Sequence, residues 1–125
     1  MIVDTDVLIW YSRKNENAIK LIHSLNDFSI SVITYMEIIQ GVRNKDELNH
    51  FKKALSILNV NVLQINDMIS TKAMFFIEQY TLSHSIELAD ALIGASAIIT
   101  KMPLITGNDK HYKHLPGLEI QKFNK

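Results

Sequence analysis

Hydrophobic residues along the chain fall into short runs that alternate with longer stretches of helical spacing. The short runs fit buried strands, and they cover residues 1–3, 28–32, 60–65, 104–106 and 118–122. The longer stretches repeat apolar residues every three or four positions, and they cover residues 6–11, 15–27, 34–41, 44–58, 67–82 and 87–100. Strands that alternate with helices favour a parallel sheet with helices on both faces. We therefore expect an α/β fold with three α/β/α layers and a mostly parallel, four- to five-stranded sheet.

Residues that commonly begin or end helices mark the limits of the helix over residues 34–41 and the start of the next one. Gly41 suits the C′ position after the last turn, and Asn44 suits the N-cap of the next helix. Thr34 and Glu37 have the spacing of a capping box, in which the glutamate reaches back to the start of its own helix. Apolar neighbours on both sides of Glu37 argue that its carboxylate is not freely solvated. Glu37 therefore has two interpretations, a helix cap or a site carboxylate.

Asp90 is the acidic residue that is hardest to explain structurally. It lies in the helical stretch over residues 87–100, which is apolar on nearly every side and is therefore expected to be buried. A buried carboxylate is unfavourable by several kcal/mol unless a cation or hydrogen-bond donors compensate it. The structural alternative is that Asp90 caps a helix that begins there. We favour a functional role for Asp90.

Other polar residues follow directly after the predicted strands. Asp4 ends the first strand and could cap the following helix or serve in a site. Thr106, Asn108 and Asp109 follow the strand over residues 104–106, where Gly-Asn-Asp could also be simple turn chemistry. In open α/β sheets, ligands bind outside the carboxyl ends of the strands. If the first and fourth strands are neighbours, these residues share one crevice.

Composition narrows the chemistry of such a site. The chain has 125 residues, which fits one domain over residues 1–125, and 47% of them are hydrophobic. It has no cysteine, which excludes disulfides, thiolate metal sites and a cysteine nucleophile. The 13 acidic residues make oxygen the expected metal ligand, and oxygen ligands select hard cations such as Mg²⁺ or Mn²⁺. A formal net charge of zero argues against non-specific coating of nucleic acid.

The sequence also gives expectations about location. Residues 1–11 lack the basic segment of a signal peptide, and no apolar run approaches the length of a membrane span. We therefore expect a cytoplasmic protein with no membrane association.

Several carboxylates at one point repel one another and resist ionisation without a counter-charge. A divalent cation supplies that charge, polarises a phosphoryl oxygen and makes hydroxide available from water near neutral pH. Phosphodiester hydrolysis is the reaction that such a site performs well.

The chain resembles a PIN domain of the VapC toxin type, a ribonuclease family of type II toxin–antitoxin systems. The resemblance covers nearly the whole length, and its order and spacing make it specific. It rests on residues 1–9, 31–37 with Gly41, 88–97 and 104–108, followed by Tyr112 and residues 115–118. It implies a Mg²⁺/Mn²⁺-dependent endoribonuclease that hydrolyses RNA through metal-activated water. It also implies a homodimer that is held inactive by a cognate antitoxin.

The resemblance assigns roles to individual residues. Asp4, Glu37 and Asp90 match the acidic catalytic and metal-binding positions of the family, and Thr5 and Thr106 match hydroxyl positions that line the site. The fourth acidic position departs from the family, because Asn108 stands where many members have aspartate and Asp109 follows it. Either residue could complete the metal site. Lys110 and Lys113 are candidate contacts to RNA phosphates.

Three other functions fit parts of the sequence. A haloacid-dehalogenase-like phosphatase would use Asp4 as nucleophile and Asp6 as general acid, but it leaves Glu37 and Asp90 unexplained. A phospho-receiver domain would be phosphorylated at Asp67, but the lysine–proline pair that such domains carry after the last strand is absent. The third alternative is an inactive PIN scaffold, which the asparagine at position 108 allows.

Overall fold

Five parallel strands form one sheet in the computed structural model, which describes residues 1–125. The strands are β1 (Ile2–Val3), β2 (Phe28–Ser31), β3 (Val60–Leu63), β4 (Leu104–Thr106) and β5 (Ile120–Lys122). Their order in the sheet is β3-β2-β1-β4-β5, and every adjacent pair is parallel. The chain thus builds outward from β1 to β3 on one side and then from β4 to β5 on the other. This places a topological switch point between β1 and β4, where open α/β sheets bind ligands.

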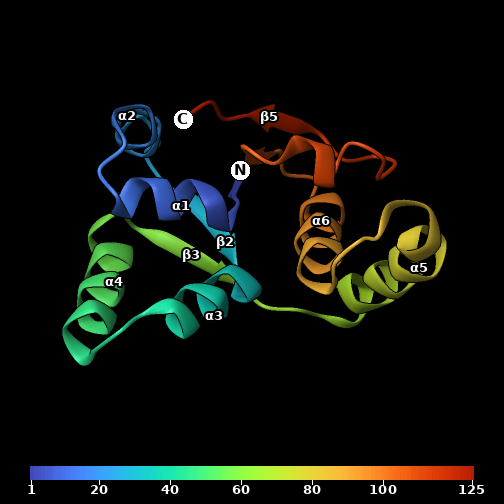
Figure 1. Cartoon of the computed structure of the whole chain (residues 1–125), viewed down its shortest axis with the longest axis horizontal. Coiled ribbons are helices and arrows are strands. Elements are labelled where there is room, and N and C mark those ends of the chain that lie inside the picture. The colour runs from blue at the N-terminus through green and yellow to red at the C-terminus, as the bar shows by residue number, and fades with distance from the viewer.

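Six α-helices and one short 3-10 helix connect the strands (Figure 1). They are α1 (Thr5–Ser12), α2 (Glu16–Ser24), α3 (Val32–Gly41), α4 (Lys45–Ile57), α5 (Asp67–His84), α6 (Leu88–Thr100) and η1 (Asp109–His111). Each strand and helix predicted from the hydrophobic pattern is present, with ends that shift by a few residues. The α/β fold with a parallel sheet is confirmed.

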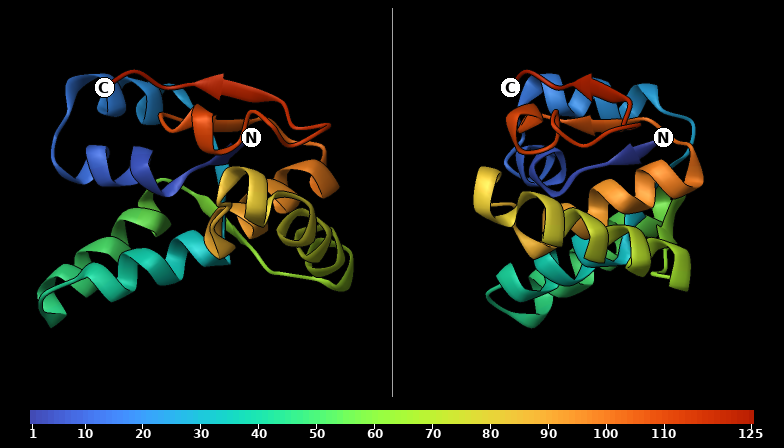
Figure 2. Two further views of the ribbon diagram at one scale, coloured as in Figure 1. Left: turned by 45° about the vertical axis from the view of Figure 1, so that its right-hand side comes forward. Right: turned by 90° about the vertical axis from the view of Figure 1, so that its right-hand side faces the viewer.

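Alternate residues of the central strands point to opposite faces of the sheet, so each face has its own core. Ile2 and Leu104 are fully buried on the face covered by α5 and α6. Val3 and Ile105 are fully buried on the other face, against α1 and α2. Figures 1 and 2 show α5 and α6 side by side, with α1 and α2 across the sheet from them. These are the three expected layers.

The ends of α3 differ from the prediction. Ser31 is the N-cap, and its hydroxyl accepts a hydrogen bond from the backbone N–H of Ile33. Thr34 therefore lies inside the helix, and the predicted capping box with Glu37 is wrong. Gly41 is the last helical residue rather than a C′ residue, and it lacks the positive φ of that position. The predicted Asn44 cap is confirmed, since its side chain accepts from the N–H of Glu47.

None of the helices combines the length and apolar character needed to cross a membrane.

Candidate active site

Asp4 lies at the switch point, directly after β1. The pairing of β1 with β4 aligns Val3 with Ile105, which brings Thr106 beside Asp4. Thr106 donates its hydroxyl hydrogen to Asp4 Oδ2 at 2.7 Å, and the backbone N–H of Thr5 donates to Asp4 Oδ1 at 2.8 Å. Asp4 therefore caps α1, as its structural interpretation predicted, and also belongs to a polar cluster. The neighbouring position of β1 and β4, which sequence reasoning required, is now established.

Asp90 approaches Asp4 from the first turn of α6. The helix begins at Leu88 with Glu87 as N-cap residue, so the alternative that Asp90 caps this helix is wrong. The hydroxyl of Tyr112 lies 3.1 Å from Asp4 Oδ1 and 3.1 Å from Asp90 Oδ1. One buried phenol thus connects two carboxylates that are 86 positions apart in the sequence.

Glu37 reaches the same region from α3. The hydroxyl of Thr5 donates to Glu37 Oε1 at 2.7 Å and lies 2.9 Å from the hydroxyl of Thr34. The negative charge of Glu37 is close enough to Asp90 to contribute to the raised pKa of that carboxyl. The three predicted acidic residues thus come from the end of β1 and from two helices, and they lie around one region.

The carboxyls of this region are unusually hard to ionise. Burial raises the pKa of Asp4 to about 7, and the charges of Asp6 and Asp90 add to the rise, against the hydrogen bonds from Thr106 and Thr5. Burial also raises the pKa of Asp90, where the bond from Tyr112 acts in the opposite direction. The pKa of Tyr112 rises well above its ordinary value because the phenol is buried beside two carboxylates, so it stays a neutral hydrogen-bond donor. No positive group offsets the effect of burial on the pKa of Asp4.

Asp6 ties α1 to the loop after β4. Its Oδ2 accepts a hydrogen bond of 2.9 Å from the backbone N–H of Gly107, whereas its Oδ1 is buried without a partner. Burial raises the pKa of this carboxyl as well. Because Gly107 immediately precedes Asn108, the bond fixes the loop that carries the fourth predicted position.

A side chain at position 107 would disturb this link, and Gly107→Ala is expected to lower the free energy of unfolding by about 1–3 kcal/mol. The added Cβ would lie 2.7 Å from Asp6 Oδ2 and 3.3 Å from the carbonyl oxygen of Phe123. Urea denaturation measures the change. Gly41→Ala is the matched control, because nothing lies within 4 Å of a Cβ there. Equal stability of the two variants would contradict a tight contact at Gly107.

Asn108 and Asp109 are less closely connected to the other carboxylates. The backbone N–H of Asn108 donates to the Thr106 hydroxyl at 3.0 Å, and the same hydroxyl donates to Asp4. Asp109 begins η1, and its Oδ1 lies 3.5 Å from Lys122 Nζ at the end of β5. Lys110 and Lys113 are exposed on the segment that follows. Asn108 is therefore closer to the polar network through its backbone than Asp109 is through its carboxylate.

Sequence reasoning missed two residues of this network. Tyr112 was recognised only as part of the resemblance, and His111 was assigned no role. In the structure, His111 Nδ1 lies 3.4 Å from Asp90 Oδ2, with the imidazole partly exposed. Their place in the sequence could have indicated both residues, because they follow the strand that ends at Thr106 and so lie near the carboxyl ends of the strands.

The donor set of this region suits a hard cation that binds few protein ligands. The candidate metal ligands are all carboxylate oxygens. Asp4 is buried and has no positive group to compensate its charge, which makes binding of a cation favourable. No group of three acidic or histidine side chains is close enough to form a complete protein cage for a metal. Mg²⁺ commonly uses one or two carboxylates together with water and substrate phosphates, so the pair Asp4 and Asp90 fits that ion.

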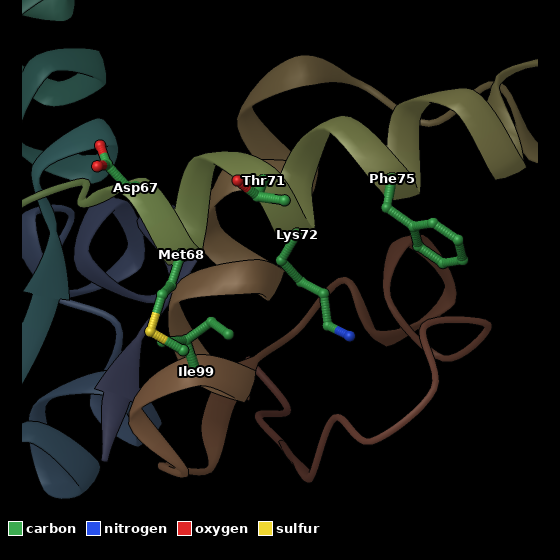
Figure 3. Close-up of a pocket in the computed structure, with 6 residues that line it drawn as sticks. All are labelled: Asp67, Met68, Thr71, Lys72, Phe75 and Ile99. Carbon is green, nitrogen blue, oxygen red and sulfur yellow. The ribbon is translucent and has the colours of Figure 1, made fainter.

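Two alternative functions lose support here. Asp67, the phosphorylation site of the phospho-receiver alternative, is exposed at the rim of a hollow of about 500 Å³ on α5 and α6 (Figure 3). Its neighbours there are Met68, Thr71 and Lys72, and the sheet order differs from the 2-1-3-4-5 order of receiver domains. Asp6, the general acid of the phosphatase alternative, has its Oδ2 bonded to the backbone of Gly107. Neither alternative explains the link between Asp4 and Asp90.

These features define an α/β domain with an acidic site at the switch point of its parallel sheet. The model of the PIN domain family matches residues 1–118, and the chain belongs to that family. Ribonuclease VapC1 of Methanocaldococcus jannaschii is 29% identical over 128 residues, which cover all of this chain and 88% of that protein.

Solved structures give the same result for the fold. A toxin–antitoxin complex from Klebsiella pneumoniae contains a chain that is 27% identical, with a TM-score of 0.78 over 94% of this chain and 93% of that one. VapBC-1 from nontypeable Haemophilus influenzae has a TM-score of 0.81 at 22% identity, over 99% and 98% of the two chains. The predicted relationship to PIN domains is confirmed.

Proposed function

We propose that this chain is a Mg²⁺- or Mn²⁺-dependent endoribonuclease, a single nuclease domain over residues 1–125 that acts as the toxin of a VapBC-type pair. One observation carries the proposal. The buried Asp4 and the half-buried Asp90 share a single hydroxyl at the switch point of a PIN-domain sheet. The name of the archaeal relative supplies the substrate class, since it is a ribonuclease.

Asp4 and Asp90 would hold the cation, with Glu37 beside them. Thr106 and the N–H of Thr5 orient Asp4 so that each oxygen has a fixed direction, and the hydroxyl of Thr5 does the same for Glu37. A bound Mg²⁺ or Mn²⁺ would polarise a phosphoryl oxygen and activate water for attack on phosphorus. Asn108 is the better candidate than Asp109 for the fourth position, because its backbone bonds to Thr106 whereas Asp109 lies beside Lys122.

Positive groups line the approach to these carboxylates. Lys110 and Lys113 are exposed on either side of His111 and Tyr112, both of which contact Asp90. An RNA strand whose phosphate lies near Asp4 and Asp90 would pass this segment. We therefore keep Lys110 and Lys113 as candidate contacts to the RNA backbone.

The partner of the proposed toxin is an antitoxin protein. The similar structure from Klebsiella pneumoniae is a toxin–antitoxin complex, which supports this part of the proposal. Homodimer formation and a cytoplasmic location stay predictions.

The proposal is tested by incubating the purified chain with total tRNA and rRNA in Mg²⁺ or Mn²⁺, with and without a chelator. We expect cleavage that needs the metal and that chelation abolishes. Cleavage that persists in the chelator would overturn metal dependence. Binding of RNA without cleavage in either metal would instead favour the inactive scaffold.

Variants identify which carboxylates are used. Asp90→Asn and Glu37→Gln are expected to reduce cleavage. Asp90→Asn neutralises a proposed ligand, Glu37→Gln neutralises the carboxylate beside the proposed cation, and both substitutions keep the size of the side chain. Asp27→Asn is the matched control, since Asp27 is exposed and precedes β2 at the opposite edge of the sheet. A control variant that loses as much activity as Asp90→Asn would show that the effect is not specific to the site.

A further inference from the structure

We infer that Tyr112 is a positioning residue that sets the geometry of Asp4 and Asp90 and thereby the affinity of the site for its cation. The inference rests on the proposed function and concerns a residue to which neither the family match nor the sequence motif assigns a role at the site. Its basis is the hydroxyl of Tyr112, which is 3.1 Å from one oxygen of each carboxylate.

The position of this hydroxyl is fixed by packing and not by the carboxylates. Tyr112 is only 1% exposed, and its ring belongs to the hydrophobic core between the sheet, α5 and α6. The ring packs on α6 at Gly94, where a Cβ would be in ordinary contact with Tyr112 Cδ1 at 3.6 Å but would clash with Leu115 Cδ1 at 2.6 Å. The backbone N–H of Tyr112 also donates to the carbonyl of Asp109 at 2.9 Å. The core thus presents a rigid phenol to the site.

No other hydrogen bond links the side chains of Asp4 and Asp90 and fixes the distance between their carboxylates. Asp4 follows β1 and Asp90 lies on α6, and each is held by its own element. A tyrosine hydroxyl has one hydrogen, so it donates to one carboxylate at a time while its oxygen faces the other. The hydroxyl therefore sets the spacing of the pair and adds no positive charge of its own, so both carboxylates stay available to a cation.

Residues that orient metal ligands without touching the metal contribute strongly to affinity, and their loss typically weakens it about 10–100-fold. Tyr112→Phe removes the hydroxyl and keeps the ring, so the core packing is retained. We expect Mn²⁺ to bind this variant about 10–100-fold more weakly than the wild type. We also expect the KM for RNA at saturating Mn²⁺ to be unchanged, because Tyr112 is only 1% exposed and so offers no surface for RNA to bind.

The test is isothermal titration calorimetry of Mn²⁺ into the whole chain without RNA, for the wild type, Tyr112→Phe and Tyr80→Phe. Tyr80 is the matched control, because its ring packs against the same core while its hydroxyl does not contribute to the environment of Asp4 or Asp90. The expected result is weak binding by Tyr112→Phe alone, with cleavage that recovers as Mn²⁺ is raised. A merely structural role would lower thermal stability without this recovery.

The outcomes separate the two claims. Equal or tighter Mn²⁺ binding by Tyr112→Phe, with normal binding by the wild type, overturns the role of Tyr112 and leaves the proposed function standing. No Mn²⁺ binding by the wild type overturns the metal-dependent function, and the role of Tyr112 with it.

Discussion

Asp4→Asn is expected to lower the rate of metal-dependent RNA cleavage by at least about a hundredfold while the chain stays folded. Changes to residues that only orient a metal ligand already lower activity about 10–100-fold, and Asp4 is a proposed ligand itself. Asparagine has the size of aspartate, and its single amide oxygen can still accept the hydrogen bond from the N–H of Thr5 that caps α1. Its NH2 group then takes the place of the other oxygen, where the hydroxyl of Thr106 can turn to accept from it instead. Asparagine cannot supply the negative charge that holds a divalent cation.

Initial cleavage rates at several Mn²⁺ concentrations measure this effect, with Asp27→Asn as the control of equal chemistry. Circular dichroism and thermal unfolding establish that the variant is folded. Loss of a metal ligand predicts at least about a hundredfold lower rate. A cleavage rate of Asp4→Asn within about threefold of the wild type would show that Asp4 is not a ligand and would overturn the proposed function.

The metal-free protein is expected to lose stability as the pH rises from about 4 to above 7, and Asp4 alone contributes at most about 4 kcal/mol to this loss. Burial raises the pKa of Asp4 from 3.8 to about 7 in the folded chain. Between these values the folded state binds a proton at Asp4 that the unfolded state has released, so the free energy of unfolding falls with increasing pH. The contribution is fully present below the unfolded pKa and is lost as the pH passes the folded one. The raised pKa of Asp90 acts in the same direction.

Urea denaturation in a chelator at pH 5, 6, 7 and 8 measures this dependence. Asp4→Asn should give a flatter profile and a more stable metal-free protein at pH 8, because the neutral amide never ionises. Mg²⁺ should raise the stability of the wild type at pH 8 but change the variant little, since binding to the folded state stabilises it. A wild-type profile as flat as that of the variant would contradict the raised pKa of Asp4.

Much of this fold could be predicted because its elements have regular periodicity. The apolar run of Met1–Val3 predicted the first strand, and the nearly all-apolar stretch over residues 87–100 predicted the buried helix α6. Alternation of strands with helices then favoured a parallel sheet. The carboxylate of Asp90 stood out for the same reason, since a charge in an apolar helix requires compensation from outside that helix.

Local capping signals were less dependable because several residues could serve the same role. Thr34 with Glu37 matched a capping box, yet Ser31 begins the helix three residues earlier. The carboxylate of Glu37 was therefore free to bond with Thr5 of another helix. Asp109 was predicted as a possible fourth ligand, but Lys122 of the last strand lies beside it. Such choices depend on neighbours that are distant in sequence.

The sequence by itself determined the elements of the α/β fold, the absence of thiol chemistry and the acidic residues around which the site forms. Only the tertiary structure decided that β4 lies beside β1, which joins Thr106 to Asp4, and that Tyr112 spans Asp4 and Asp90. Periodicity and capping are properties of neighbouring residues, so they can be recognised along the chain. Strand order, burial and the raised pKa of Asp4 arise from packing between residues about a hundred positions apart, which no local pattern encodes.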